Sequence, residues 1–342
     1  MTRRVALFSP LGASLLLGAT SGAEPQTIRT RTFHLDYRIT VKDVPATAHQ
    51  LKLWVPVPHD DLWQQIEGLT ISSPYKYTIT AARNGNRMLH LEVNAPKERT
   101  FSLDLQFQAS RKEHVQFRLL NGSRLTSGES EQALKPYLRP DRLVPINEQI
   151  RSWAQEVVNQ AHAHTDLDLA RAIYNHVIST VKYDKSGEGW GRGDIYYACE
   201  KRRGNCTDFH AMFIGYCRAL GIPARFAIGF PLPARRGTGI IAGYHCWAEF
   251  YAKGIGWVPV DASEAQKNPA KREYFFGAHD ENRIELSKGR DLLLVPRQHG
   301  EPLNYFVYPY AEIDGKAFAG VEHNVTYQDT SAPEWATLRT TN

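Results

Sequence analysis

Strict alternation of apolar and polar residues in the first third of the chain constrains its fold most strongly. Between Thr32 and Val41 every second side chain is apolar, which is the pattern of a strand with one buried face. The same period recurs in four later runs, which span Leu51 to Val57, Tyr75 to Ile79, Leu89 to Val93 and Phe101 to Phe107. Five such runs within about 80 residues predict an all-β, sandwich-like domain over residues 27–120.

The composition changes after this region. Residues 121–145 are rich in glycine, serine, proline and mixed charge, which predicts a linker. Apolar residues then recur at helical spacing from Ile146 and again from Asp166, and a third helix is expected over residues 206–220. Three strand-like runs follow, at residues 225–230, 244–251 and 256–261. One helix followed by three strands predicts an α+β domain over residues 146–300, and residues 301–342 are expected to pack on it as a C-terminal extension.

The first 23 residues have the layout of a secretory signal peptide. Arg3 and Arg4 precede an apolar run from Val5 to Ala19, and small residues at positions 21–23 form a cleavage site. This run is shorter than an ordinary membrane span, and no other stretch reaches about 18 apolar residues, so no stable membrane insertion is expected. We therefore expect an exported protein, periplasmic or extracellular.

The charge balance does not favour nucleic acid as a partner. The whole chain carries a formal net charge of +5, and removal of residues 1–23 with their two arginines lowers it to about +3. The basic clusters fall in predicted loops and carry no run of aromatic residues, whereas a nucleic-acid-binding surface usually shows a basic stripe. The residues of the second domain are therefore the better guide to the partners of this protein.

The stretch "GNCTDFHAMFIGYCRALGIPAR" places Cys206 directly at the start of the third predicted helix. Four roles are open for this residue: a buried core thiol, half of a disulfide, a metal ligand or a nucleophile. A disulfide with Cys217 is excluded, because eleven helical residues rise by about 16.5 Å and the Cα limit is about 7 Å. Cys199 and Cys246 remain possible partners. The chain has no C-x-x-C motif, so a zinc site is not favoured.

A nucleophilic thiol at this position would need a base, and two histidines are candidates. His210 lies one turn along the same helix, where it can simply pack. His245 is the favoured base. It lies in "GYHCWAEFY", where alternation puts His245 on one face of a strand and Cys246 on the other. Cys246 is therefore expected to be a packing cysteine. Asp261 ends the next strand and could accept a hydrogen bond from His245, while Asp208 in the first helical turn opposes a thiolate.

These two stretches, "GNCTDFHAMFIGYCRALGIPAR" and "GYHCWAEFYAKGIGWVPVDAS", resemble the transglutaminase-like superfamily of papain-type cysteine enzymes, in its bacterial branch. The resemblance extends roughly from Asp166 to Pro296. It implies a catalytic triad of Cys206, His245 and Asp261, a helix packed on an antiparallel sheet, and a preceding β domain. It also implies acyl transfer through a thioester, with a peptide or protein as substrate and water or an amine as the acyl acceptor.

The resemblance also suggests which groups could hold the oxyanion of the reaction. The Cys206 backbone N–H is one donor, and better-known relatives add an aromatic or amide side chain upstream of the cysteine. Trp190, Tyr196 and Tyr197 are the candidates here, and the sequence does not separate them. Trp247 is a candidate wall of the site that would exclude water.

Neither a metal nor a cofactor is expected. The calcium sites of animal transglutaminases have no visible counterpart as an acidic loop in this chain. The glycine-rich segment "GEGWGRGD" lacks the lysine and hydroxyl residue of a phosphate-binding loop. A binding protein built on the same frame is the alternative to an enzyme, and the presence of all three triad residues argues against it.

Overall fold

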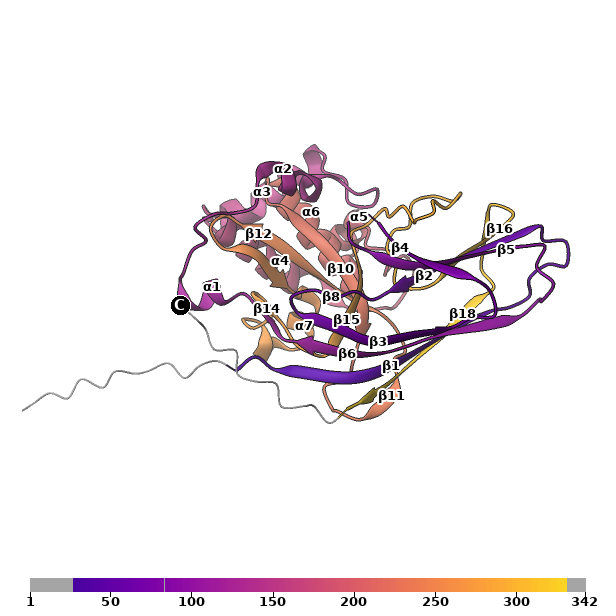
Figure 1. The fold of residues 1–342 in the computed structure, drawn as a ribbon. Helices are drawn as coiled ribbons and strands as arrows, with labels where there is room; N and C mark the ends of the chain where they lie inside the picture. Colours follow the sequence, from indigo (N-terminus) through magenta and orange to yellow (C-terminus); the bar gives the residue numbers. More distant parts are fainter. Residues whose placement is uncertain (1–26, 83, 331–342) are drawn as a thin grey trace, which may run out of the picture.

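The computed structural model of the chain describes residues 27–82 and 84–330, so the predicted signal peptide at residues 1–23 lies outside the described part. Two antiparallel five-stranded sheets face each other and form the β domain (Figure 1). Their strand orders are β11-β18-β1-β6-β3 and β17-β16-β2-β5-β4. The strands are β1 (Thr30–Val41), β2 (Gln50–Val57), β3 (Gln64–Ser72), β4 (Tyr77–Ala81), β5 (Arg87–Asn94), β6 (Phe101–Lys112), β11 (Thr238–Ile240), β16 (Tyr310–Ile313), β17 (Lys316–Phe318) and β18 (Val321–Asp329).

The alternation of β1 fills the space between these sheets. From Phe33 to Val41 every second side chain is buried, and these side chains share one core with the alternating positions of β2 from Leu51 to Val57. The predicted sandwich-like β domain is therefore confirmed. The sequence pattern missed β3, in which apolar residues are few and Gly68 interrupts the strand at a register shift against β6.

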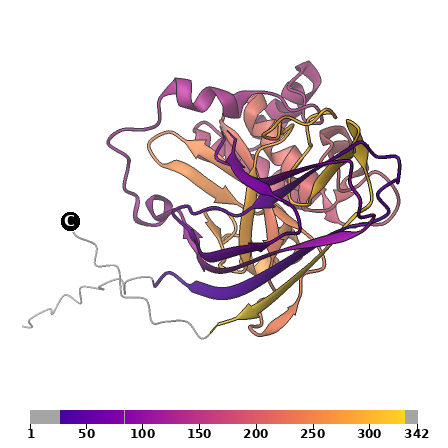
Figure 2. The same ribbon diagram turned by 45° about the vertical axis from the view of Figure 1, so that its right-hand side comes forward.

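Residues 310–329 complete the β domain, whereas residues 301–342 were expected to pack on the second domain; of this range, residues 331–342 lie outside the described part. β18 pairs with β1 from Phe33↔Asp329 to Val41↔Val321, and β16 pairs with β2. Figures 1 and 2 both show yellow β18 lying along indigo β1. Without these strands β1 and β2 would be open edges with unpaired backbone groups, which explains why the segment joins the sheets. Within the C-terminal segment, the Asn304 side chain contacts the second domain, because it accepts a hydrogen bond from Arg290 Nε.

The second domain packs helices on an antiparallel sheet, as the α+β prediction required. The sheet has the order β13-β12-β10-β15, and the buried helix α6 lies between β12 and the helices α3, α4 and α5. The elements are α3 (Glu148–Gln160), α4 (Asp166–Thr180), α5 (Ile195–Lys201), α6 (Cys206–Ala219), α7 (Ala262–Lys267), β10 (Ala224–Pro231), β12 (His245–Ala252), β13 (Gly256–Val260) and β15 (Arg283–Lys288). None of the helices within the described ranges is long and apolar enough to cross a bilayer.

Several short elements lie between these longer helices and strands. They are β7 (His114–Val115), α1 (Phe117–Asn121), α2 (Glu131–Leu134), η1 (Lys135–Leu138), β8 (Lys182–Tyr183), β9 (Arg203–Gly204), η2 (Pro269–Lys271) and β14 (Ala278–His279). Residues 121–145, expected as a linker, lie against the second domain. Within them Glu129 accepts a hydrogen bond from Trp257 Nε1 at 2.6 Å, and Asp141 pairs with Arg218 at 2.7 Å.

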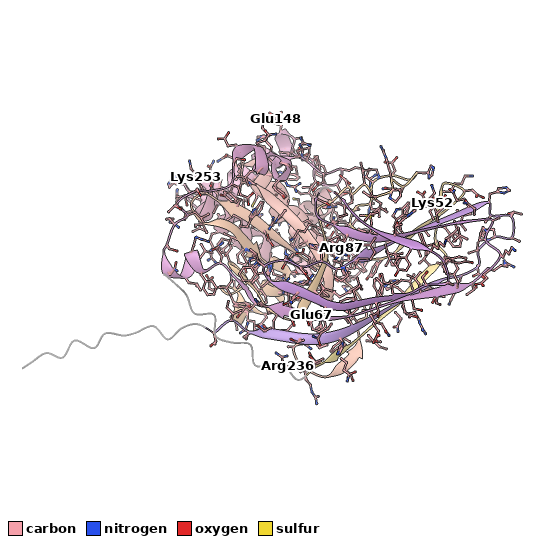
Figure 3. The ribbon with its side chains drawn as sticks, viewed as in Figure 1. Lys52, Glu67, Arg87, Glu148, Arg236 and Lys253 are labelled. Atoms are coloured by element: carbon pink, nitrogen blue, oxygen red, sulfur yellow. The ribbon has the colours of Figure 1, made fainter. Side chains whose placement is uncertain are left out.

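The β domain and the sheet of the second domain also meet through buried polar groups. The Gln64 side chain of β3 accepts from Glu285 N at 2.8 Å and donates to Glu285 O at 3.1 Å, so it bridges to the backbone of β15. β7 pairs with β14, and β11 pairs with β18. Exposed charges such as Glu148, Lys253 and Arg236 instead lie on the outside of the molecule (Figure 3).

Two buried histidines, His114 of β7 and His279 of β14, should make the folded protein less stable at acid pH. His279 is fully buried and, within the described structure, neither ring nitrogen has a hydrogen-bond partner. Burial, helped by Arg283 and His114, holds the pKa of His279 well below its usual value, and burial lowers the pKa of His114 to about 4. Because both pKa values are lower when folded, the unfolded chain binds protons first as the pH falls below about 6.5. The free energy of unfolding should then fall by up to about 1.4 kcal/mol per pH unit for each histidine.

Urea denaturation of the wild type and of His279→Leu at pH 7 and pH 5 checks this prediction. At pH 7 we expect the leucine variant to differ by about 1 kcal/mol or less, because it removes a buried polar group that has no partner. Between pH 7 and pH 5 it should lose less stability than the wild type. Equal losses in the two proteins would show that His279 binds its proton normally when folded.

Candidate active site

The start of α6 is shaped by a capping box around Cys206, the first helical residue. The Asn205 side chain accepts from Thr207 N at 2.9 Å, and the Asp208 carboxylate accepts from Asn205 N at 2.9 Å. Both contacts fix the angle at which the chain enters the helix. The Cys206 thiol therefore lies at the positive end of the helix dipole, which favours a thiolate.

Asp208 also holds the glycine-rich loop over this helix end. Its carboxylate accepts from Gly191 N at 2.7 Å and from Gly193 N at 3.0 Å, and both glycines have positive φ. Gly204 approaches the same carboxylate so closely that a Cβ atom there would lie 2.2 Å from Oδ2. Burial raises the pKa of Asp208 to about 6. The Asp208 carboxylate, which the sequence predicts to disfavour a thiolate, thus accepts hydrogen bonds from backbone N–H groups of the loop.

His245 and Asp261 lie side by side because β12 and β13 are adjacent strands. His245 is the first residue of β12, and Asp261 follows β13 and caps α7. His245 Nε2 lies 2.7 Å from Asp261 Oδ2, and both side chains are buried. Asp261 also accepts from Ser263 Oγ at 3.0 Å and from Arg283 Nη1 at 2.9 Å. The carboxylate is therefore fixed on both oxygens, and it holds one ring nitrogen of His245.

The charges of these groups support one another. Burial disfavours charge on Asp261, but His245 and Arg283 hold the pKa of its carboxyl well below the usual value. Burial likewise opposes a charged imidazole, yet Asp261 and then Cys206 raise the pKa of His245 to about 10. Burial would raise the pKa of Cys206, whereas hydrogen bonds with Cys246 and His245 and the charge of His245 hold it well below the usual value. Both pKa shifts favour a thiolate on Cys206 beside an imidazolium on His245.

The residues expected to form the oxyanion site are mostly engaged elsewhere. Trp190 Nε1 donates to Gly187 O at 3.1 Å, and Tyr196 OH accepts from Asn147 Nδ2 at 2.6 Å. Tyr197 packs its ring against the glycine-rich loop at Gly189, and its hydroxyl is buried without a partner among the described residues.

Trp247 is fully buried next to His245. The centroids of the two rings are 6.2 Å apart, and the guanidinium carbon of Arg283 lies 5.0 Å from the centroid of the Trp247 ring. Trp247 therefore packs beside His245 and Arg283 in the interior of the protein.

Four tyrosines that sequence reasoning missed surround the thiol. Burial is the main cause that raises the pKa values of Tyr183, Tyr244, Tyr305 and Tyr308, and the negative charge of Cys206 contributes to each. The Tyr244 hydroxyl accepts from Asn205 Nδ2 at 2.9 Å, and it donates to Gly191 O at 3.3 Å. Tyr244 directly precedes His245, so its position in the motif could have drawn attention. The two tyrosines of the C-terminal segment gave no such signal.

Cys246 lies on the face of β12 opposite His245, as the alternation predicts, and α6 packs on that face. It is fully buried in the core, as expected of a packing cysteine. The sequence pattern did not show that its Sγ also contacts His210 Nδ1, at 3.6 Å. All four cysteines belong to the described part of the chain and are free thiols. Among the described residues, no group of three or more histidine, cysteine or carboxylate side chains could hold a metal ion.

Comparison with known proteins places this site in a recognised domain. Residues 151–262, which include Cys206, His245 and Asp261, match the family model of the transglutaminase-like superfamily. An uncharacterised protein of Haemophilus influenzae is 26% identical over 302 residues, which cover 78% of this chain and 81% of that protein.

One solved structure has the same fold over most of the chain. A crystal structure described as a "Putative Cysteine Protease" from Cytophaga hutchinsonii has a TM-score of 0.59 and 19% sequence identity, and the match covers 91% of this chain and 96% of that one. The periplasmic domain of TgpA from Pseudomonas aeruginosa, with bound ethylmercury, has a TM-score of 0.36 and 16% identity over 68% of this chain and 77% of that one. The similarity to the first structure therefore extends over both domains.

Proposed function

We propose that this chain, whose residues 151–262 carry a transglutaminase-like domain, is a thiol-dependent acyl-transfer enzyme acting on amide bonds of peptides or proteins. The observation that supports this most strongly is the buried series of Cys206, His245 and Asp261, with 2.7 Å between His245 Nε2 and Asp261 Oδ2. A nucleophile, a base and a group that orients the base are the parts that covalent acyl transfer requires.

The proposed reaction begins with the ionised pair. The Cys206 thiolate attacks the amide carbonyl carbon, and the backbone N–H at the start of α6 stabilises the oxyanion. Because Nε2 of His245 is hydrogen-bonded to Asp261, the proton on Nδ1 is the one that passes to the leaving amine. The amine departs and a thioester with Cys206 remains. The now neutral His245 then removes a proton from water or from a second amine, which attacks the thioester and restores the thiolate.

The acyl acceptor decides between a hydrolase and a cross-linking transferase, and the same three residues serve both reactions. With water the products are those of a peptidase, amidase or deamidase, and with a lysine amine the product is an isopeptide bond. Export to the periplasm or outside the cell, predicted from residues 1–23, belongs to this proposal. It would bring the enzyme into contact with extracytoplasmic peptides and proteins.

Incubation with a glutamine-containing protein and a labelled primary amine tests the proposal. Mass spectrometry then scores amine incorporation, deamidation and chain cleavage, with Cys206→Ala as the inactive control. We expect at least one of these products, formed only when Cys206 is present. Amine incorporation identifies a transferase, whereas deamidation or cleavage alone identifies a hydrolase. A binding protein on this frame would instead give no product that depends on Cys206 across a range of peptide and protein substrates.

A further inference from the structure

A second pair of buried side chains lies beside the triad residues and has no part in the proposed reaction. His210 of α6 is fully buried, and its Nδ1 lies 3.6 Å from Cys246 Sγ. On its other side, His210 Nε2 accepts a hydrogen bond from Ala262 N at 3.2 Å. Ala262 is the first residue of α7, directly after Asp261, so its amide position is fixed by the helix.

These contacts fix the tautomer of His210. A backbone N–H can only donate, so Nε2 must be the unprotonated nitrogen of the ring. The remaining proton lies on Nδ1, where Cys246 Sγ and the Cys206 carbonyl oxygen are the neighbouring acceptors. Burial lowers the pKa of His210, which keeps the ring neutral. His210 is therefore a hydrogen-bond donor toward Cys246 and is unsuited to be the base.

Because His210 donates its hydrogen bond to Cys246 Sγ, the S–H hydrogen of Cys246 points to another acceptor. A thiol sulfur that accepts a hydrogen bond from His210 has its own S–H free to donate. Cys206 lies one helical turn before His210 on α6, so its sulfur is a neighbouring acceptor toward which this S–H can point. Burial, together with the nearby Cys206, holds the pKa of Cys246 well above its usual value, so Cys246 keeps its proton while Cys206 is ionised. Hydrogen bonds to a charged acceptor are stronger than those between neutral groups.

We propose that Cys246 donates its S–H hydrogen to the Cys206 thiolate and that His210 positions this donor, so that the two residues set the reactivity of the nucleophile. This inference rests on the proposed function, because it assumes that Cys206 reacts as a thiolate. Cys217 provides the contrast on the same helix. It is equally buried, and burial alone raises the pKa of its thiol.

The ionisation of Cys206 also depends on the other groups that face it. They come from α6, the start of β12, β8, the N-cap of α7 and the C-terminal segment, and are Asp208, His210, Tyr244, His245, Cys246, Tyr183, Asp261, Tyr305 and Tyr308. A change at Cys246 leaves all of the others in place. The effect of its S–H can therefore be measured against an otherwise constant environment.

The test is the pH dependence of Cys206 alkylation by iodoacetamide, followed for the Cys206 peptide by mass spectrometry. Cys246→Ala removes the donor and should raise the midpoint of the profile by about one pH unit. Cys246→Ser keeps a hydroxyl donor and should recover a good part of this shift. Cys217→Ala, the matched control in the same helix, should leave the midpoint unchanged.

The outcomes separate this inference from the proposed function. A low wild-type midpoint that Cys246→Ala leaves in place would overturn the role of Cys246 and spare the nucleophile. A serine variant that shifts as far as the alanine variant would show that Cys246 contributes only packing. A wild-type midpoint at the value of an ordinary thiol would overturn both proposals, because no thiolate would then exist for Cys246 to stabilise.

Discussion

Replacing Cys206 by alanine should lower kcat/KM for the amide substrate by at least about 10³-fold and leave the fold intact. The thiol makes the covalent bond to the substrate, and none of the other three cysteines is suited to replace it. Burial raises the pKa of Cys199 to about 11 and is the main cause that holds the pKa of Cys246 well above its usual value. Cys217 is a fully buried thiol further along α6. The measurement is a rate assay on the substrate identified by mass spectrometry, with circular dichroism to confirm folding.

Cys217→Ala is the matched control, since it removes a buried thiol from the same helix at a distance from the reacting groups. We expect it to cost some stability through the small cavity and to keep most of the activity. Retention of more than a tenth of wild-type activity by Cys206→Ala would show that the reaction does not use this thiol.

Replacing Asp261 by asparagine should lower kcat by about 10² to 10⁴-fold with little change in shape. An amide can still accept from Ser263 Oγ and from Glu264 N, so the cap of α7 can persist. It cannot balance the charge on His245, whose pKa should fall. The Cys206 and His245 pair would then be ionised over a narrower pH range, and Arg283 would lose a buried partner at 2.9 Å. Both the maximum value of kcat and the shape of its pH profile are therefore expected to change.

Asp329→Asn serves as the control for the loss of a buried ion pair. Asp329 accepts from Arg31 Nε and Nη2, each at 2.8 Å, within the β domain and away from the thiol. Both variants should lower the free energy of unfolding, by as much as about 3 kcal/mol for a well-buried pair. Only Asp261→Asn should lower kcat of the folded enzyme. Equal effects of the two variants on kcat would mean that Asp261 matters for folding alone.

Local patterns in the sequence were sufficient for much of the architecture. The alternation of β1 predicts its buried face, because side chains in a strand point to opposite sides whatever its neighbours are. The start of α6 follows from Asn205 and the capping residue Asp208, which act within one helical turn. Cys206, His245 and Asp261 were selected in the same way, from short motifs that each lie at the start or end of one element.

Contacts between distant segments could not be predicted from such patterns. The pairing of β18 with β1 joins two described segments that lie far apart in the sequence, and a linear pattern does not specify a strand's partner. Tyr305 reaches the site through this same long-range arrangement. The contact of Cys246 with His210 was missed because alternation gives the face of a strand but not the side chain that packs on that face. The orientation of His210 depends on the Ala262 amide, which is likewise set by tertiary packing.

The pairing of a Cys206 thiolate with a His245 imidazolium is tested most directly by the pH profile of Cys206 alkylation in the wild type and in His245→Ala. In the wild type the midpoint should lie well below the value of about 8.5 for a free thiol, so that Cys206 is alkylated rapidly at pH 6. In His245→Ala the midpoint should rise to 8.5 or above, about the ordinary value or higher, because burial then acts on the thiol without its counter-charge. A wild-type midpoint near about 8.5 that does not respond to His245→Ala would contradict the ion pair and the acyl-transfer function built on it.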